Sequence, residues 1–143
     1  MLKFLVPVDG SAASGRAIEQ LIASIGWYRE RPEVHLLNVQ APLPVGGRVS
    51  SYIGQDQIAQ YHQDEGLAAL APARQKLDAA GIAHHYHIGV GEVADVVMQY
   101  VKDKGCDQIV MGTRGMSGIS SIVLGSVANK VIHAATVPVL LLR

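Results

Sequence analysis

The sequence predicts a single α/β domain built on a doubly wound, five-stranded parallel sheet with helices on both faces. Three observations lead to this prediction. The chain has 143 residues, which suits one domain over residues 1–143. Short β-branched runs alternate with longer segments of helical periodicity, in the order βαβαβαβαβ. Apolar residues make up 49% of the chain and charged residues 17%, a composition typical of a compact core.

The predicted strands are short runs at residues 4–8, 34–39, 83–88, 108–111 and 137–142. All of them are mostly apolar except the third, which holds three histidines. With right-handed crossovers that wind two ways from the first strand, the expected strand order is 3-2-1-4-5. The third and fifth strands then lie at the edges of the sheet. The order reverses between the first and fourth strands, and ligands of such sheets bind beyond the carboxyl ends of the strands at that reversal.

Four segments have apolar residues at helical spacing. Ser11 or Ser14 can cap the first helix, and Gly26 can end it. The second helix is expected over about residues 57–80, and Pro72 predicts a kink or break within it because proline lacks a backbone donor. On one side of this helix the pattern places Ile58, Tyr61, Leu70, Ala73 and Leu77. Residues 41–56, rich in glycine, proline and serine, form the one long loop, a feature that is usually functional or mobile.

Composition excludes several classes of protein. Twelve basic residues balance twelve acidic ones, so the basic excess of a nucleic-acid binder is missing. The longest apolar run has six residues, too few to span a membrane, and residues 4–8 are too short for the core of a secretion signal. A single cysteine, Cys106, excludes an internal disulfide, and we interpret it as a packed thiol. We therefore expect a cytoplasmic protein without membrane or nucleic-acid partners.

Small residues are concentrated where the predicted strand order reverses. Residues 9–11 follow the first strand, and the segment 112–127, rich in glycine and serine, leads from the fourth strand into the last helix. Glycines let the backbone approach a ligand closely, and a helix N-terminus offers unpaired N–H groups to an anion. This segment therefore predicts a phosphate-binding site made of main chain. Arg114, inside it, could reach a terminal phosphate.

Specific motifs carry a resemblance to a known family. Gly112-x-x-Gly115, then nine residues, then Gly125-Ser126 resembles the nucleotide-binding signature of the ATP-binding branch of the universal stress protein (UspA-like) family. The opening VPVDGS, the closing VPVLLL and the Gly89-Val90-Gly91 turn are also similar to that family, and the resemblance covers the whole chain.

The resemblance implies a role for each matching residue. Pro7, Val8 and Asp9 would lie beside the adenosine, and Val39 would meet the adenine through its backbone. The ribose would lie between Met111 and Gly112, and the phosphates would be held by Gly115, Gly125, Ser126 and Val127. Asp9 also suits a turn-forming or capping residue, and both roles can hold at once. Any Mg²⁺ would be held mainly by the phosphates of ATP.

These residues predict an ATP-binding regulatory switch of a stress response, with slow hydrolysis or none. Only Asp9 and Arg114 are available to assist hydrolysis. Three alternatives stay open: a weak ATPase or nucleotide-transferring enzyme that uses the same pocket, an interaction module without a nucleotide, and NAD binding. The NAD alternative rests on residues 89–94, which fit G-x-G-x-x-A. No acid closes the following strand, and the expected edge position also disfavours it.

The two edge strands of the predicted sheet indicate what this protein could bind. The last strand, which begins at Val137 and ends at Leu142, is apolar on both faces, so we expect a homodimer that pairs this edge. Alternatively, residues 41–56 of the same chain could cover this apolar edge in place of a second copy. An unknown regulatory protein would read the ATP-bound state. In the third strand His85 and His87 share a face beside His84, but no acid or cysteine stands nearby in the sequence, so we expect polar edge residues rather than a metal site.

Overall fold

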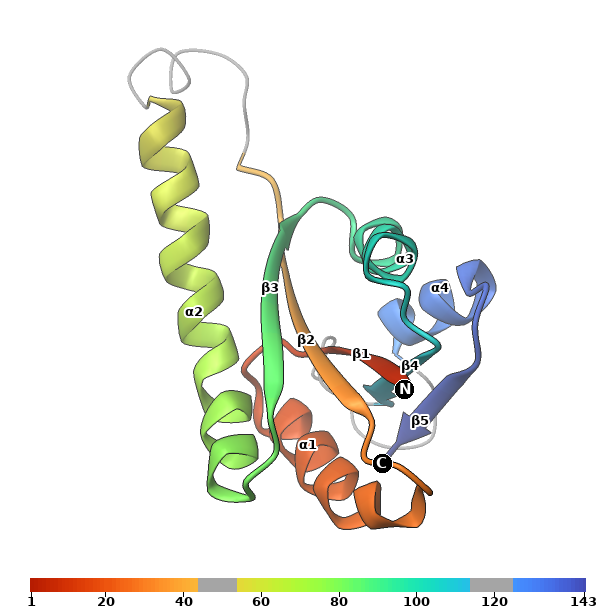
Figure 1. Cartoon of the computed structure of the whole chain (residues 1–143). Helices are drawn as coiled ribbons and strands as arrows, with labels where there is room; N and C mark the ends of the chain where they lie inside the picture. Colours follow the sequence, from red (N-terminus) through yellow and green to blue (C-terminus); the bar gives the residue numbers. More distant parts are fainter. Residues whose placement is uncertain (44–53, 114–124) are drawn as a thin grey trace.

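The computed structural model describes residues 1–43, 54–113 and 125–143 (Figure 1). Its parallel sheet consists of β1 (Lys3–Pro7), β2 (Glu33–Gln40), β3 (His84–Val90), β4 (Gln108–Gly112) and β5 (Val139–Leu142). The strand order is β3-β2-β1-β4-β5, which confirms the predicted order and places β3 and β5 at the edges. The predicted strand bounds differ from these by one or two residues.

Helices cover both faces of the sheet, as expected. They are α1 (Ala12–Ser24), α2 (Gln55–Ala79), α3 (Val93–Lys104) and α4 (Ser126–Ala134), with a short 3₁₀ helix, η1 (Ile25–Trp27), after α1. Helices α1 and α2 lie on one face of the sheet and α3 and α4 on the other (Figure 1). Successive side chains of a strand point to opposite faces, so Phe4 and Val6 of β1 pack with α1 and α2, and Leu5 packs with α3 and α4. The sheet therefore separates two apolar cores.

Local sequence signals explain how the helices begin and end. Ser11 is the N-cap of α1, and its Oγ accepts a hydrogen bond from the N–H of Ser14. Gly26 does not end α1 directly, because the chain continues into η1 and Gly26 lies inside it. Gly105 ends α3 in the left-handed conformation, with φ at 65°, which glycine adopts without strain.

The helix α2 is continuous through Pro72, so of the predicted kink or break the break is wrong. The carbonyl that loses a donor belongs to Ala68, which is exposed and open to water. Burial on both sides of the proline holds the helix together. Its buried positions, mostly four residues apart, are His62, Gly66, Leu70, Ala73 and Leu77. Tyr61, predicted on the apolar side, is instead exposed.

Within the described residues no helix is both long enough and apolar enough to cross a membrane.

Candidate functional site

The carboxyl ends of β1 and β4 lie side by side, because these strands are neighbours in a parallel sheet. Pro7 ends β1 and continues into Val8 and Asp9, and Met111 and Gly112 end β4. The structure therefore brings five of the predicted site residues together at the reversal of strand order. This edge is where open parallel sheets bind their ligands.

A buried amide fixes the end of β1. The Val8 N–H donates to the Leu37 carbonyl at 2.9 Å, and Asn38 Nδ2 donates to the Val8 carbonyl, also at 2.9 Å. Asn38 is only 3% exposed. The sequence analysis missed this residue. A polar residue in the middle of an apolar strand was the available signal, since buried amides are retained where they have partners.

Asp9 forms the turn between β1 and α1. Its Oδ1 accepts from the N–H of Ser11 at 2.9 Å, and its own N–H donates to Ser14 Oγ at 3.1 Å. Gly10 between them has φ at +83°, and a Cβ there would lie 3.0 Å from the Ala69 Cα. The turn-forming interpretation of Asp9 is confirmed, and its contact with a ribose or a Mg²⁺ ion stays a prediction.

The start of α4 lies at the end of β4. The Thr113 N–H donates to the Leu142 carbonyl at 2.9 Å, and the Gly125 N–H donates to the Thr113 carbonyl at 3.3 Å. The N-cap of α4 is Gly125, which has no side chain to bond the first amides of the helix, whereas Ser11 caps α1 and Glu92 caps α3. The first amides of α4, at Ser126 and Val127, thus begin beside the ends of β4 and β5. Two further predicted phosphate ligands, Arg114 and Gly115, lie outside the described residues.

The glycines of the G-x-G-x-x-A segment serve close packing of β3 against α3. A Cβ on Gly89 would lie 2.5 Å from Val96 Cγ1 and 3.2 Å from Tyr100 Cε2. The segment also begins inside the edge strand β3, away from the reversal of strand order. Both facts favour the packing interpretation over NAD binding. Val39, the predicted adenine contact, pairs with Gly89 in the last part of β2.

An apolar cavity of about 460 Å³ lies between α2 and the ends of β2 and β3. Its lining includes Leu43, Ile58, His62, Ile88 and Val90. None of the predicted nucleotide-site residues that the structure describes lines it. The candidate nucleotide site at the carboxyl ends of β1 and β4 is therefore separate from this cavity. Strand ends and the first amides of α4 form the candidate site.

Cys106 is a packed thiol, as the sequence predicts. Its side chain lies in the core on the α3 side, and the residue is 5% exposed. Burial raises the pKa of this thiol, so the reactive thiolate is disfavoured.

The sequence analysis missed a carboxylate beside the histidines of β3. Residue His35 pairs with His85 across β2 and β3, and Glu33 lies two residues before His35 on the same face of β2. The hydrogen bond from His35 lowers the pKa of Glu33. Burial, together with the nearby His35, lowers the pKa of His87 to about 4, so this ring is neutral at pH 7. Only the strand register, which the sequence does not show, brings these residues together.

The fold is that of an open, doubly wound α/β protein whose strand order reverses between β1 and β4. A model of the universal stress protein family matches residues 1–143. The universal stress protein YxiE of Bacillus subtilis is 33% identical over 150 residues, which cover 99% of this chain and 98% of YxiE. The chain belongs to the universal stress protein family.

Solved structures share the fold. The structure of the hypothetical protein MJ0577 matches with a TM-score of 0.80 and 26% identity, over 99% of this chain and 94% of that chain. The Arabidopsis thaliana family protein At3g01520, solved with AMP bound, has a TM-score of 0.69 at 23% identity, over 99% and 91%. The Archaeoglobus fulgidus universal stress protein in complex with dAMP has a TM-score of 0.63 at 24% identity, over 100% and 98%.

Proposed function

We propose that this protein binds ATP at the carboxyl edge between β1 and β4 and acts as a nucleotide-dependent regulatory switch in a stress response of the cytoplasm. Hydrolysis is slow or absent. The only acid among the described site residues is Asp9, and its Oδ1 is already held by the Ser11 N–H. A partner protein reads the ATP-bound state, and the protein works as a homodimer through β5.

One observation carries the proposal: α4, whose N-cap Gly125 has no side chain, begins where β4 ends. Unpaired amides and the positive end of a helix dipole favour a phosphate there. Two related structures were solved with AMP or dAMP, which supports an adenine nucleotide.

The proposed contacts follow the strand ends. The adenosine lies along the end of β1 and of β2, the ribose lies at the end of β4, and the phosphates lie at α4. The residues proposed for these contacts are Pro7, Val8, Asp9, Val39, Met111, Gly112, Arg114, Gly115, Gly125, Ser126 and Val127. Mg²⁺ is bound mainly by the ATP phosphates.

The substitution Ser126→Asp tests the site directly. Ser126 is exposed at the first position of α4. A negative charge there stabilises the helix by about 0.3–1 kcal/mol through the helix dipole, yet it repels a phosphate. We expect the variant to keep or slightly raise its thermal midpoint without ligand and to lose its affinity for Mg-ATP. The measurement is thermal unfolding with and without the nucleotide.

The matched control is Ser126→Ala, which adds no charge and should respond to Mg-ATP almost as the natural protein does. At a concentration of about 100 times its Kd, a ligand stabilises the folded state by about 2.7 kcal/mol. The absence of any shift in the natural protein at millimolar ATP would favour an interaction module without a nucleotide. A shift with NADH but not with ATP would favour NAD binding, and steady multi-turnover ADP release would make the protein an ATPase.

A further inference from the structure

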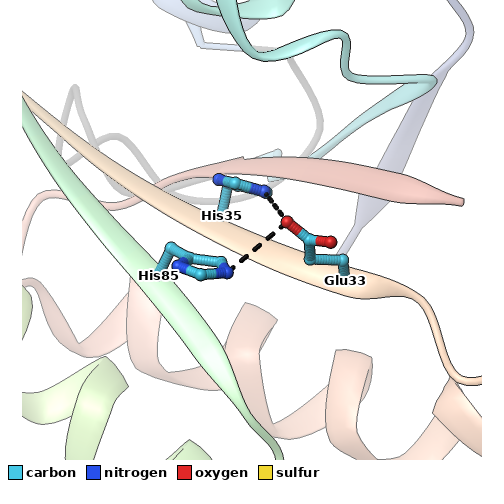
Figure 2. A group of neighbouring side chains, drawn as sticks. All are labelled: Glu33, His35 and His85. Carbon is cyan, nitrogen blue, oxygen red and sulfur yellow. Dashed lines mark hydrogen bonds and ion pairs between the residues drawn. The ribbon is translucent and has the colours of Figure 1, made fainter. Parts of the chain in front are cut away.

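A cluster of three potential metal ligands lies on β2 and β3, where these strands begin (Figure 2). The Oε1 atom of Glu33 is 2.6 Å from His35 Nε2 and 3.4 Å from His85 Nε2. One ligand atom from each residue lies within 4.8 Å of the other two. Figure 2 shows the two rings on neighbouring strands, both joined to the same carboxylate oxygen.

The sheet itself fixes this geometry. His35 and His85 are register partners, and their rings stack with centroids 4.8 Å apart. The His35 side chain is buried, the Glu33 side chain is 28% exposed, and the His85 side chain is 59% exposed. The cluster thus has a buried, rigid base and an open side.

We propose that Glu33, His35 and His85 bind a divalent transition-metal ion of the zinc type. Zinc takes imidazole nitrogen and carboxylate oxygen ligands at about 2.0–2.2 Å in a tetrahedral arrangement, which separates neighbouring ligand atoms by roughly 3.4 Å. The distance between Glu33 and His85 already fits this value. The shorter His35–Glu33 contact is a hydrogen bond, and its atoms separate slightly when the metal takes the position of the proton.

His87 is the positioning residue for this site. Its Nε2 lies 2.9 Å from His35 Nδ1. When Nε2 of His35 binds the metal, Nδ1 carries the ring proton and donates a hydrogen bond to His87 Nε2. This hydrogen bond fixes the orientation and the tautomer of the ligand. The Tyr100 ring of α3 packs on His87, with centroids 5.4 Å apart. The ligand therefore has the oriented outer partner that histidine ligands of metal sites have.

Solvent has access to the site through a surface cavity of about 380 Å³. Glu33 and His85 line it, together with Arg31, Pro32, Ala83 and Gly81. A water molecule from this cavity can complete the tetrahedron. Because the cluster lies near the amino ends of β2 and β3, it is separate from the proposed nucleotide site at the carboxyl ends of β1 and β4. The two proposals are independent of each other.

The test is a titration of the metal-free protein, without a histidine tag, with ZnCl₂ by calorimetry, and with CoCl₂ by visible absorption. We expect one equivalent to bind, and Co²⁺ to develop the absorption of a tetrahedral site. The variants His85→Ala and Glu33→Gln should each weaken binding by more than the roughly tenfold loss expected when only the outer partner is removed. Their side chains are partly exposed, so both variants should fold.

The variant His87→Phe should weaken binding roughly tenfold, whereas His87→Gln, which keeps an acceptor, should recover part of that loss. The control His133→Ala removes an exposed histidine on α4 and should leave binding unchanged. As a second measurement, Zn²⁺ should raise the thermal midpoint of the natural protein and not that of His85→Ala. Failure of the natural protein to bind either metal, or equal binding by His85→Ala and the natural protein, would overturn the proposal.

Discussion

Asn38 is the buried residue that holds the end of β1 at the candidate nucleotide site. The substitution Asn38→Leu keeps the side-chain volume nearly constant but removes the donor to the Val8 carbonyl. We expect a loss of about 1–3 kcal/mol in the free energy of unfolding, because a buried acceptor loses its partner. Nucleotide affinity should fall as well, since Val8 and Asp9 are no longer held in place. Urea denaturation and thermal shifts with Mg-ATP measure the two effects.

The control for Asn38 is Gln40→Ala. The Gln40 Nε2 group donates to Asn38 Oδ1 at 2.5 Å, but Gln40 is only half-buried. Its loss should therefore cost less than the loss of Asn38. An unchanged urea midpoint in Asn38→Leu would contradict the proposed role.

Single residues were predictable where their partners are close in sequence. The turn at Asp9 follows from local spacing, as does a serine cap of α1 at Ser11 or Ser14, and the structure confirms the turn and selects Ser11 as the cap. Glu33 was missed because its partner His85 is far away in the sequence. Their contact depends on the β2–β3 register, and a shift of one residue would turn the histidines to the other face.

At the scale of elements, the close approach of α2 to β3 depends on Gly66. A Cβ there would lie 2.7 Å from Ile88 Cδ1 and 2.8 Å from Cγ1 and Cγ2 of the same side chain. In an exposed helix, replacing glycine with alanine gains about 1 kcal/mol. Here we expect Gly66→Ala to destabilise the protein, because α2 must move away from the sheet. Urea denaturation of Gly66→Ala, Ile88→Ala and the double variant measures this coupling.

The matched control is Gly15→Ala in α1. Its added Cβ would meet only the flexible end of Lys76, at 3.4 Å, so this variant should be stabilised. The penalty of Gly66→Ala should shrink in the Ile88→Ala background. A gain of stability from Gly66→Ala in the natural protein would show that the helix does not need this glycine.

Strands and helices were predictable from periodicity, whereas their ends and their interruptions were not. Every strand of the sheet was predicted within two residues of its bounds. Four strands are mostly apolar, because a strand buried in a parallel sheet needs apolar side chains on both faces, whereas the edge strand β3 carries three histidines. The prediction of a break at Pro72 failed because it considered only the backbone donor that proline lacks. It left out the burial of Leu70, Ala73 and Leu77, which stabilises the helix on both sides of the proline. Tertiary packing decides such cases.

At the scale of the whole molecule, the two edges of the sheet differ in chemistry. The β3 edge carries His84, His85 and His87, which discourage pairing with another sheet. The β5 edge is apolar, and beside it lies a cavity of about 410 Å³ lined by residues that include Trp27, Leu140 and Leu142. Trp27 is 85% exposed. The alternative to a homodimer is that residues 41–56 cover the β5 edge. The described ends of this segment lie toward β3, where the Ala41 carbonyl bonds His62 and Gln55 lines the apolar cavity.

The proposed homodimer pairs the β5 strands of two copies, and Leu141→Pro tests it. The Ile109 N–H donates to the Pro138 carbonyl, and the Thr113 N–H donates to the Leu142 carbonyl. The backbone N–H and C=O groups of the even-numbered residues of β5 therefore point toward β4. The Leu141 N–H therefore points to the free edge, where proline removes a donor without touching the β4 ladder. We expect Leu141→Pro to sediment as a folded monomer, and Leu141→Ala, which keeps the N–H, to stay dimeric. A dimer mass in folded Leu141→Pro, or a natural protein that sediments as a monomer, would contradict pairing through β5.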